Sequence, residues 1–212
     1  MTDFDNMLAG YRRFRETGWA QQRERWDELR DGQSPGVMII ACSDSRVDPA
    51  QIFDTNPGEV FVVRNVAALV PPFETAPGRH GVSAALEFAV QVIGVSEILV
   101  MGHGRCGGCH AALTQELKDA PPGEGGFIAH WIELLDDARA KVVAQFGNEH
   151  SPESHRAMEH EGVKVSLENL RTFPCIREKE RNGELRLIGA FFAISDGVLN
   201  LLDENTGQFA SA

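Results

Sequence analysis

The sequence predicts an α/β fold with a central, mostly parallel β-sheet flanked by helices and an N-terminal helical arm. Short apolar runs such as GVMIIACSDS (36–45) alternate with segments of helical periodicity. The runs are almost continuously apolar, which is typical of strands covered on both faces of a parallel sheet. The 212 residues show no repeat and no long linker. We therefore expect one domain over 1–212, with an arm at 1–32 and a core at 33–212.

The arm is predicted from residues 4–30. Phe4, Leu8, Tyr11 and Phe14 recur at steps of three and four, which indicates a helix. A second helical stretch ends near Gly32. Most of the arm is polar, so it packs either on a partner subunit or on the chain's own core.

The core elements follow in order along the chain. We expect strands at 36–45, 58–67 and 96–108, helices at 80–95, 109–118, 127–147 and 152–170, a break at 120–126, and a strand pair or a strand and turn at 185–203. In open α/β sheets the functional site lies beyond the carboxyl ends of the strands. Cys42 and His103 both follow such ends, so we expect them to lie close together.

Charge and composition limit the partners and the compartment. Lys and Arg number 20 against 31 Asp and Glu, a net charge of −11, which argues against nucleic acid or an anionic membrane as a partner. The apolar runs fall short of the ~20 residues of a membrane helix, and the first residues are too polar for a signal peptide. We expect a cytoplasmic protein, in which the four cysteines serve metal binding, catalysis or burial.

Four residues near the strand ends form a candidate metal site: Cys42, Asp44, His103 and Cys106. Two thiolates, an imidazole and a carboxylate suit zinc, and we expect one Zn²⁺ per chain. A purely structural zinc site is the alternative. Such sites are usually closed by four Cys or His ligands, whereas here Arg46 follows the carboxylate by two residues, which favours an exchangeable ligand.

The other candidate ligands are interpreted more simply. A lone cysteine is usually a small buried hydrophobe, and a lone histidine is usually an ordinary polar group with its hydrogen bonds satisfied. We prefer these interpretations for Cys109, Cys175 and His110. Cys106 and Cys109 also form a C-x-x-C. A redox role for that pair is disfavoured, because a thioredoxin-like unit would not bring an Asp-x-Arg partner.

Several motifs together resemble one family. From about residue 30 to 207 the chain is similar, in order and spacing, to the β-class carbonic anhydrases, through CSDSRVDP, FVVRNVAALVPP, AALEFAV, GHGRCGG, SLENLRTFP and GAFFAISDGVLNLLD. The resemblance implies a zinc enzyme that interconverts CO2 and water with bicarbonate and a proton. It also implies a parallel-sheet core, an arm that wraps a partner, and a homodimer or a dimer of dimers.

The resemblance assigns roles to the central residues. Cys42, His103 and Cys106 would be the permanent zinc ligands, and Asp44 and Arg46 the catalytic pair. Arg46 would keep Asp44 ionised, so that Asp44 accepts a hydrogen bond from the attacking water and passes a proton outward. If the hydrogen bonds from Arg46 to Asp44 break, Asp44 can bind the metal at its fourth position.

The resemblance also assigns a substrate pocket. Gln33 would donate a hydrogen bond to bicarbonate and Gly107 a backbone N–H, while Phe61, Val66 and Phe88 would form an apolar wall. Ordinary core packing is the alternative for the three apolar side chains. The family often has tyrosine where this chain has Phe88.

One departure from the family bears on Asp44. Some members carry an inhibitory bicarbonate pocket that uses a tryptophan where this chain has Ile39, and a late tyrosine, whereas the single tyrosine here is Tyr11. We therefore expect Asp44 to pair with Arg46 near neutral pH, and activity to rise toward alkaline pH.

Two other functions stay open. The same scaffold could hydrolyse a CO2-like molecule such as CS2 or COS. It could also be a zinc-stabilised, non-catalytic binding protein, although such a site has no need of Arg46.

Overall fold

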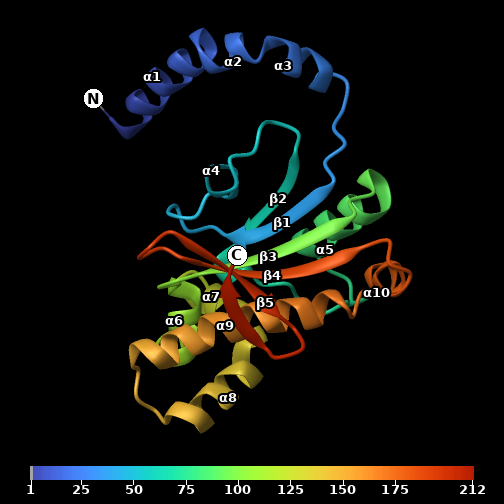
Figure 1. Cartoon of the computed structure of the whole chain (residues 1–212). Helices are drawn as coiled ribbons and strands as arrows, with labels where there is room; N and C mark the ends of the chain where they lie inside the picture. The colour runs from blue at the N-terminus through green and yellow to red at the C-terminus, as the bar shows by residue number, and fades with distance from the viewer. Residues whose placement is uncertain (1) are drawn as a thin grey trace.

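The computed structural model describes residues 2–212, which form one twisted sheet with most helices on one side (Figure 1). The sheet has six strands in the order β2-β1-β3-β4-β5-β6. The strands are β1 (Val37–Cys42), β2 (Val60–Asn65), β3 (Glu97–His103), β4 (Arg186–Ala193), β5 (Val198–Asp203) and β6 (Gln208–Ser211). The first four strands are parallel, and β5 and β6 are antiparallel. The predicted mostly parallel sheet is confirmed.

The helices begin and end as follows: α1 (Asp3–Glu16), α2 (Gly18–Gln21), α3 (Arg23–Leu29), α4 (Pro49–Ile52), α5 (Gly81–Glu87), α6 (Gly107–Thr114), α7 (Gly126–Ile132), α8 (Asp136–Phe146), α9 (Pro152–Leu170) and α10 (Pro174–Arg181). There are also two short 3-10 segments, η1 (Val66–Ala68) and η3 (Glu133–Leu135), and one π-helical segment, η2 (Phe88–Ile93).

Three helices differ from the prediction. The helix expected at 80–95 is regular only to Glu87, continues as a π-helical turn, and ends at Gly94, whose φ of 80° suits glycine. The helix expected at 127–147 is divided by η3. The helix expected at 109–118 begins earlier, at Gly107, and ends at Thr114.

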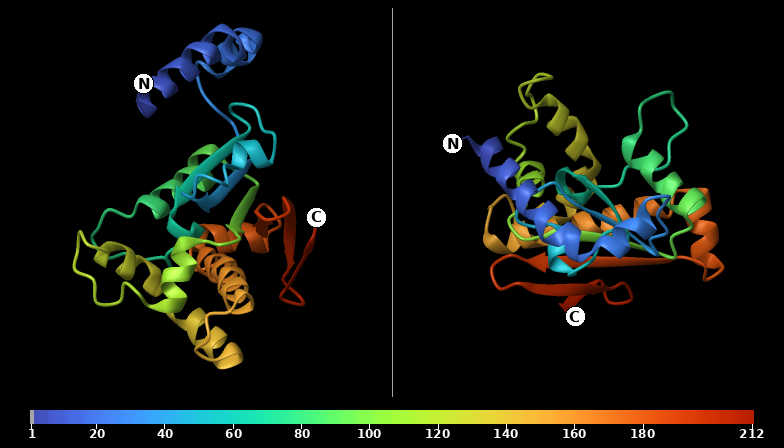
Figure 2. Two further views of the ribbon diagram at one scale, coloured as in Figure 1. Left: turned by 90° about the vertical axis from the view of Figure 1, so that its left-hand side faces the viewer. Right: turned by 90° about the horizontal axis from the view of Figure 1, so that it is seen from above.

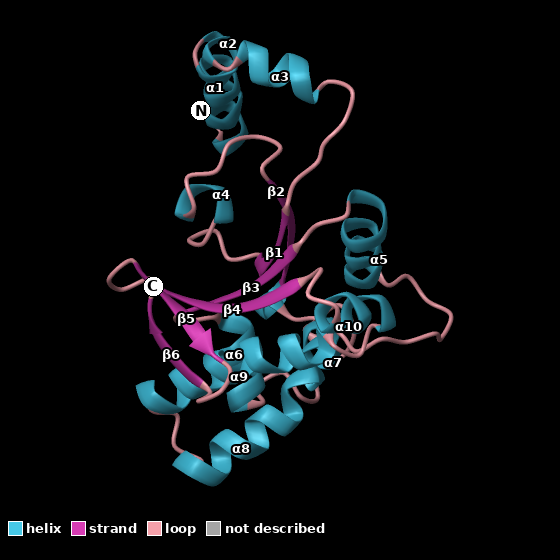
Figure 3. Ribbon diagram, turned by 45° about the vertical axis from the view of Figure 1, so that its right-hand side comes forward, coloured by secondary structure: helices cyan, strands magenta, loops and turns pink. Residues whose placement is uncertain are grey.

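The core lies mainly between the sheet and α9. Val163 and Leu167 of α9 pack with Ile98 and Val100 of β3 in one apolar cluster. Helix α8 packs on the side of α9 away from the sheet, and α6 packs beside α9 (Figure 3). This layer fixes the carboxyl ends of β1 and β3, where the candidate ligands lie.

The arm, α1 to α3, stands away from the rest of the chain. The two further views agree that it projects beyond the sheet (Figure 2). None of its residues in these helices is buried, and Phe4, Met7 and Tyr11 are each more than half exposed. Within residues 2–212, no helix is long and apolar enough to cross a membrane.

Candidate metal centre

Three predicted ligands converge at the carboxyl edge of the sheet. Cys42 ends β1, His103 ends β3, and Cys106 is the residue before α6. The Sγ atoms of Cys42 and Cys106 are 4.0 Å apart, and the donor atoms of all three residues lie within 4.8 Å of one another. All three are buried. This donor set has the chemistry and spacing to hold a zinc ion.

His103 is oriented as a metal ligand. Its Nδ1 lies 3.0 Å from the carbonyl oxygen of Gly104, which can only accept, so Nδ1 carries the hydrogen. Nε2 is then left with a lone pair. That atom is buried and has no hydrogen-bond partner among the described residues. An orphaned buried nitrogen is costly unless a ligand satisfies it, which supports the fit to a metal.

The two thiols are protonated in the absence of a cation. The hydrogen bond to Cys106 and then burial raise the pKa of the Cys42 thiol to about 12. A hydrogen bond to Cys109 and burial likewise raise the pKa of Cys106. Without a positive charge the neutral thiols are favoured, whereas a divalent ion at this point would favour both thiolates.

Asp44 lies beside the donors, paired with Arg46. Nε of Arg46 donates to Oδ1 at 2.9 Å, and Nη2 donates to Oδ2 at 2.6 Å. The backbone N–H of Arg46 also donates to Oδ1, at 3.0 Å. These bonds hold the pKa of Asp44 well below its usual range. Oδ2 lies 3.9 Å from Nε2 of His103, so the carboxylate faces the donor group while Arg46 holds it.

Arg64 fixes the same loop from the neighbouring strand. Its Nε donates to the Cys42 carbonyl at 2.9 Å, Nη2 to the Asp44 carbonyl at 2.6 Å, and Nη1 to Asp48 at 3.0 Å. The sequence offered a signal for this residue, because it lies in the RN motif of β2. It was not among the predicted site residues, since its partners are chiefly main-chain carbonyls, which sequence does not distinguish.

The predicted pocket residues divide into two groups. Val66 and Gly107 lie near the donors: Val66 follows Asn65, which pairs with Cys42 in the sheet, and a Cβ on Gly108 would be 2.7 Å from Val66. Gly107 directly follows Cys106. These two residues border the candidate metal centre of their own chain.

Gln33, Phe61 and Phe88 do not join the donors within one chain. Phe61 pairs with Met38, four residues before Cys42, or about 13 Å along the strand. Its ring lies 6.0 Å from that of Phe88, which is 44% exposed. Gln33 is exposed and precedes the amino end of β1. These three residues therefore lie toward the opposite end of the strands.

The remaining cysteines and His110 take no part in the donor group. Cys109 is buried and Cys175 is half-buried, in line with ordinary packing. His110 is exposed, and its ring stacks on His155 at 4.9 Å.

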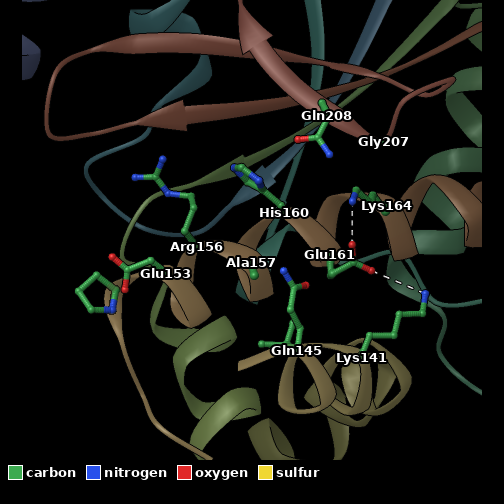
Figure 4. Close-up of a pocket in the computed structure, with 12 residues that line it drawn as sticks. Lys141, Gln145, Glu153, Arg156, Ala157, His160, Glu161, Lys164, Gly207 and Gln208 are labelled. Atoms are coloured by element: carbon green, nitrogen blue, oxygen red, sulfur yellow. Dashed lines mark hydrogen bonds and ion pairs between the residues drawn. The ribbon is translucent and has the colours of Figure 1, made fainter. Parts of the chain in front are cut away.

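A hollow of about 690 Å³ lies between α8, α9 and β6, away from the metal donors (Figure 4). It contains none of the predicted site residues. Lys141 and Lys164 border it, but both are paired with Glu161, at 3.6 and 2.8 Å. The two lysines share this one carboxylate, and the described metal-donor group of cysteines and histidine lies elsewhere, so the hollow is not a substitute for it.

Comparison with known proteins agrees with this geometry. The family model for carbonic anhydrase matches residues 37–199. The chain is 37% identical over 193 residues to chloroplastic beta carbonic anhydrase 5 of Arabidopsis thaliana, covering 91% of this chain and 62% of that protein. It is 36% identical over 208 residues to a carbonic anhydrase of Pseudomonas aeruginosa, covering 97% and 90%.

Solved structures show the same fold. The β-carbonic anhydrase CcaA has a TM-score of 0.90 at 28% identity, covering 99% of this chain and 92% of that one. A tetrameric β-carbonic anhydrase of Sordaria macrospora has a TM-score of 0.81 at 28% identity, covering 94% and 96%. Together with the buried cysteine–histidine–cysteine donor set, these matches show that the chain belongs to the β-carbonic anhydrase family.

Proposed function

We propose that this chain catalyses the reversible hydration of CO2 to bicarbonate and a proton. One observation carries the proposal: the buried donor set of Cys42, His103 and Cys106 lies next to a carboxylate held by an arginine fork. A site built only for structure has no use for the second feature. Hydration of CO2 needs a metal and an acceptor for the hydrogen bond of the attacking water, and this geometry offers ligands for the first and a carboxylate for the second.

The roles of the residues follow from their chemistry. Cys42, His103 and Cys106 would hold Zn²⁺, which supplies the Lewis acidity that makes water a nucleophile near neutral pH. Asp44 accepts a hydrogen bond from the attacking water and so directs its lone pair toward CO2. Its lowered pKa keeps it ionised, so it accepts the bond without retaining the proton.

Arg46 has a separate task. Two parallel hydrogen bonds from its guanidinium fix both carboxylate oxygens of Asp44. This fork restrains Asp44 from turning onto the metal and closing the fourth position. Arg46 therefore keeps the site open, and this supports the expectation drawn from Ile39.

A second copy of the chain supplies the remaining pocket. We infer that Val66 and Gly107 contact the substrate from the same chain as the metal, and that Gln33, Phe61 and Phe88 do so from a partner. The wide separation of Phe61 from Cys42 along paired strands supports this division, as does the 44% exposure of Phe88. A homodimer, alone or as a dimer of dimers, is then the active unit.

The compartment and partners belong to the same proposal. All four cysteines are free thiols, which suits a reducing cytoplasm. The net charge of −11 makes nucleic acid and anionic membranes poor partners. The small molecules CO2 and bicarbonate are the expected substrates.

Stopped-flow measurement of CO2 hydration tests the function. We expect activity in the zinc-loaded protein, loss on chelation and recovery on adding Zn²⁺. Cys106→Ser should not recover, because a neutral hydroxyl is a poor replacement for a thiolate, whereas Cys175→Ser serves as a matched control. Hydrolysis of CS2 or COS without CO2 hydration would favour the related hydrolase, and no zinc-dependent turnover of any of the three would favour a binding protein.

A further inference from the structure

One buried carboxylate adjoins the metal centre without belonging to it. Glu159 of α9 is 5% exposed, and acidic side chains are seldom so buried unless they are paired. Its Oε1 accepts the backbone N–H of Cys106 at 3.2 Å, across 53 residues of sequence. Burial raises the pKa of Glu159, while the hydrogen bond from the backbone N–H of Cys106 opposes the increase.

The turn that Glu159 contacts serves the site in two ways. It joins His103 to Cys106, two of the three metal donors. Its middle residue, Arg105, has a φ of 55°, a left-handed conformation that is strained for any residue except glycine. Such a conformation persists where surrounding contacts hold it. The carbonyl of Arg105 also accepts a bond from Nη2 of Arg46, at 3.1 Å.

Arg156 stabilises the buried carboxylate from the other side. Its Nε lies 3.6 Å from Oε2 of Glu159, and its guanidinium lies 4.6 Å above the ring of Phe191, which is fully buried. Figure 4 shows Arg156 at the border of the hollow between α8 and α9. The Cys106 N–H on one oxygen and the positive charge of Arg156 near the other restrain this carboxylate from two sides.

We propose that Glu159 is the positioning residue of the metal centre, because it clamps the Arg105–Cys106 turn. It touches neither substrate nor metal. It acts through Cys106, whose thiolate it orients, and through the Arg105 carbonyl, to which Arg46 is anchored. A single carboxylate on α9 thereby sets both the metal ligand and the catalytic pair. Only the activity part of this proposal rests on the proposed function.

Zinc affinity and kinetics of Glu159→Ala and Glu159→Gln test the clamp. We expect Glu159→Ala to weaken zinc binding about 10- to 100-fold, the usual effect of losing a partner behind the ligands. At saturating zinc its kcat should fall with KM little changed, because Arg46 loses its anchor. Glu159→Gln should show a smaller but measurable loss of both zinc affinity and kcat, since its neutral amide oxygen accepts the Cys106 N–H more weakly than a carboxylate does. The control is Glu161→Gln, two residues along α9 and paired with Lys141 and Lys164.

The Co²⁺-loaded proteins separate positioning from simple stability. We expect the thiolate-to-cobalt absorption to change in Glu159→Ala and to match the wild type in Glu161→Gln. The proposal is overturned if zinc affinity, cobalt spectrum and kcat of Glu159→Ala all equal those of Glu161→Gln, even with a lower Tm. If Glu159→Ala does not fold, the same comparison is made with Glu159→Gln. If neither the wild type nor any variant hydrates CO2, the proposed function is wrong. Zinc affinity and the cobalt spectrum still test the role of Glu159 in that case.

Discussion

At the residue scale, two arginines fix the loop after Cys42 in different ways. Arg46 uses its fork on the Asp44 side chain, whereas Arg64 binds the main-chain carbonyls of Cys42 and Asp44. The first arrangement controls the charge and direction of Asp44, and the second controls where the loop runs. Lysine could reproduce neither, because it has one point charge and no planar pair of donors.

Arg46→Ala should reduce activity while leaving the metal in place. The substitution removes both side-chain hydrogen bonds to Asp44 and the bond to the Arg105 carbonyl, but none of the three donors. We expect CO2 hydration to fall about 10- to 100-fold, as for other partners that orient an active site. Elemental analysis should still find one zinc per chain, and loss of the zinc together with the activity would contradict this role.

Zinc affinity should rise with pH. The pKa of the Cys42 thiol is raised to about 12 and that of Cys106 is also raised, so both are protonated near neutral pH until a metal displaces the protons. One or two displaced protons correspond to an affinity gain of about 10- to 100-fold per pH unit. Competition with a chelator between pH 6 and 8, corrected for the chelator's own protonation, measures the slope. A flat profile would show that the thiols are not the ligands.

At the element scale, the close approach of α9 to β3 depends on a missing side chain. Gly102 lies directly before His103, and a Cβ there would be 2.7 Å from Val163 of α9. No ordinary contact is so short, so α9 and β3 are as close as glycine permits. The position of His103 and the position of Glu159 are therefore linked through one helix–strand contact.

Gly102→Ala should destabilise the fold and loosen the metal centre. Overpacking of this kind costs about 1–3 kcal/mol. In a chain of this size each kcal/mol lowers Tm by about 2–4 °C. Calorimetry can compare it with Gly36→Ala, where a Cβ meets nothing within 4 Å. Equal Tm values for the two variants would show that the contact relaxes without cost.

The elements were predictable where their pattern is local. β1 and β3 are continuous apolar runs, and the buried positions of α9 recur every three or four residues. All three elements were therefore expected. α10 is short and strongly charged, and β6 has four residues that become a strand only by pairing with β5; neither was expected. The π-helical turn at Phe88–Ile93 interrupts a segment that the sequence pattern predicted as one regular helix.

The same distinction holds for the site. Cys42, Asp44 and Arg46 share one short segment, and His103 and Cys106 another, and parallel strands bring the two ends together. Arg64 and Glu159 act through backbone groups 22 and 53 residues away. Arg64 stood in the FVVRNVAALVPP stretch, but its role there was not assigned, and no motif marked Glu159. Gln33, Phe61 and Phe88 were predicted by resemblance alone, and one chain does not bring them to the metal donors.

At the scale of the whole molecule, the arm exposes apolar side chains that a partner could cover. Phe4, Met7 and Tyr11 form an apolar stripe on α1 and are 64%, 69% and 56% exposed. A projecting helix with such a stripe is costly in water, and a second copy of the chain would cover it. This agrees with the separation of Phe61 and Phe88 from the metal donors of their own chain.

Phe4→Ser combined with Tyr11→Ser should shift the protein from dimer, or dimer of dimers, toward the 23.3 kDa monomer. Light scattering measures the mass, and activity should fall with it if the partner completes the pocket. Asn6→Ser, at an exposed polar position of the same helix, is the control. A fully active monomer in either protein would contradict the partner's part in the site.

Two thiolates and one imidazole of a single chain are the expected zinc ligands. X-ray absorption at the zinc edge of the zinc-loaded protein tests this ligand set. We predict two sulfur neighbours at about 2.3 Å and one nitrogen at about 2.0–2.1 Å, with an oxygen completing four ligands. Cys106→Ser should lose one sulfur, and Cys109→Ser should lose none. A shell of four sulfurs, or one of nitrogen and oxygen alone, would contradict the account.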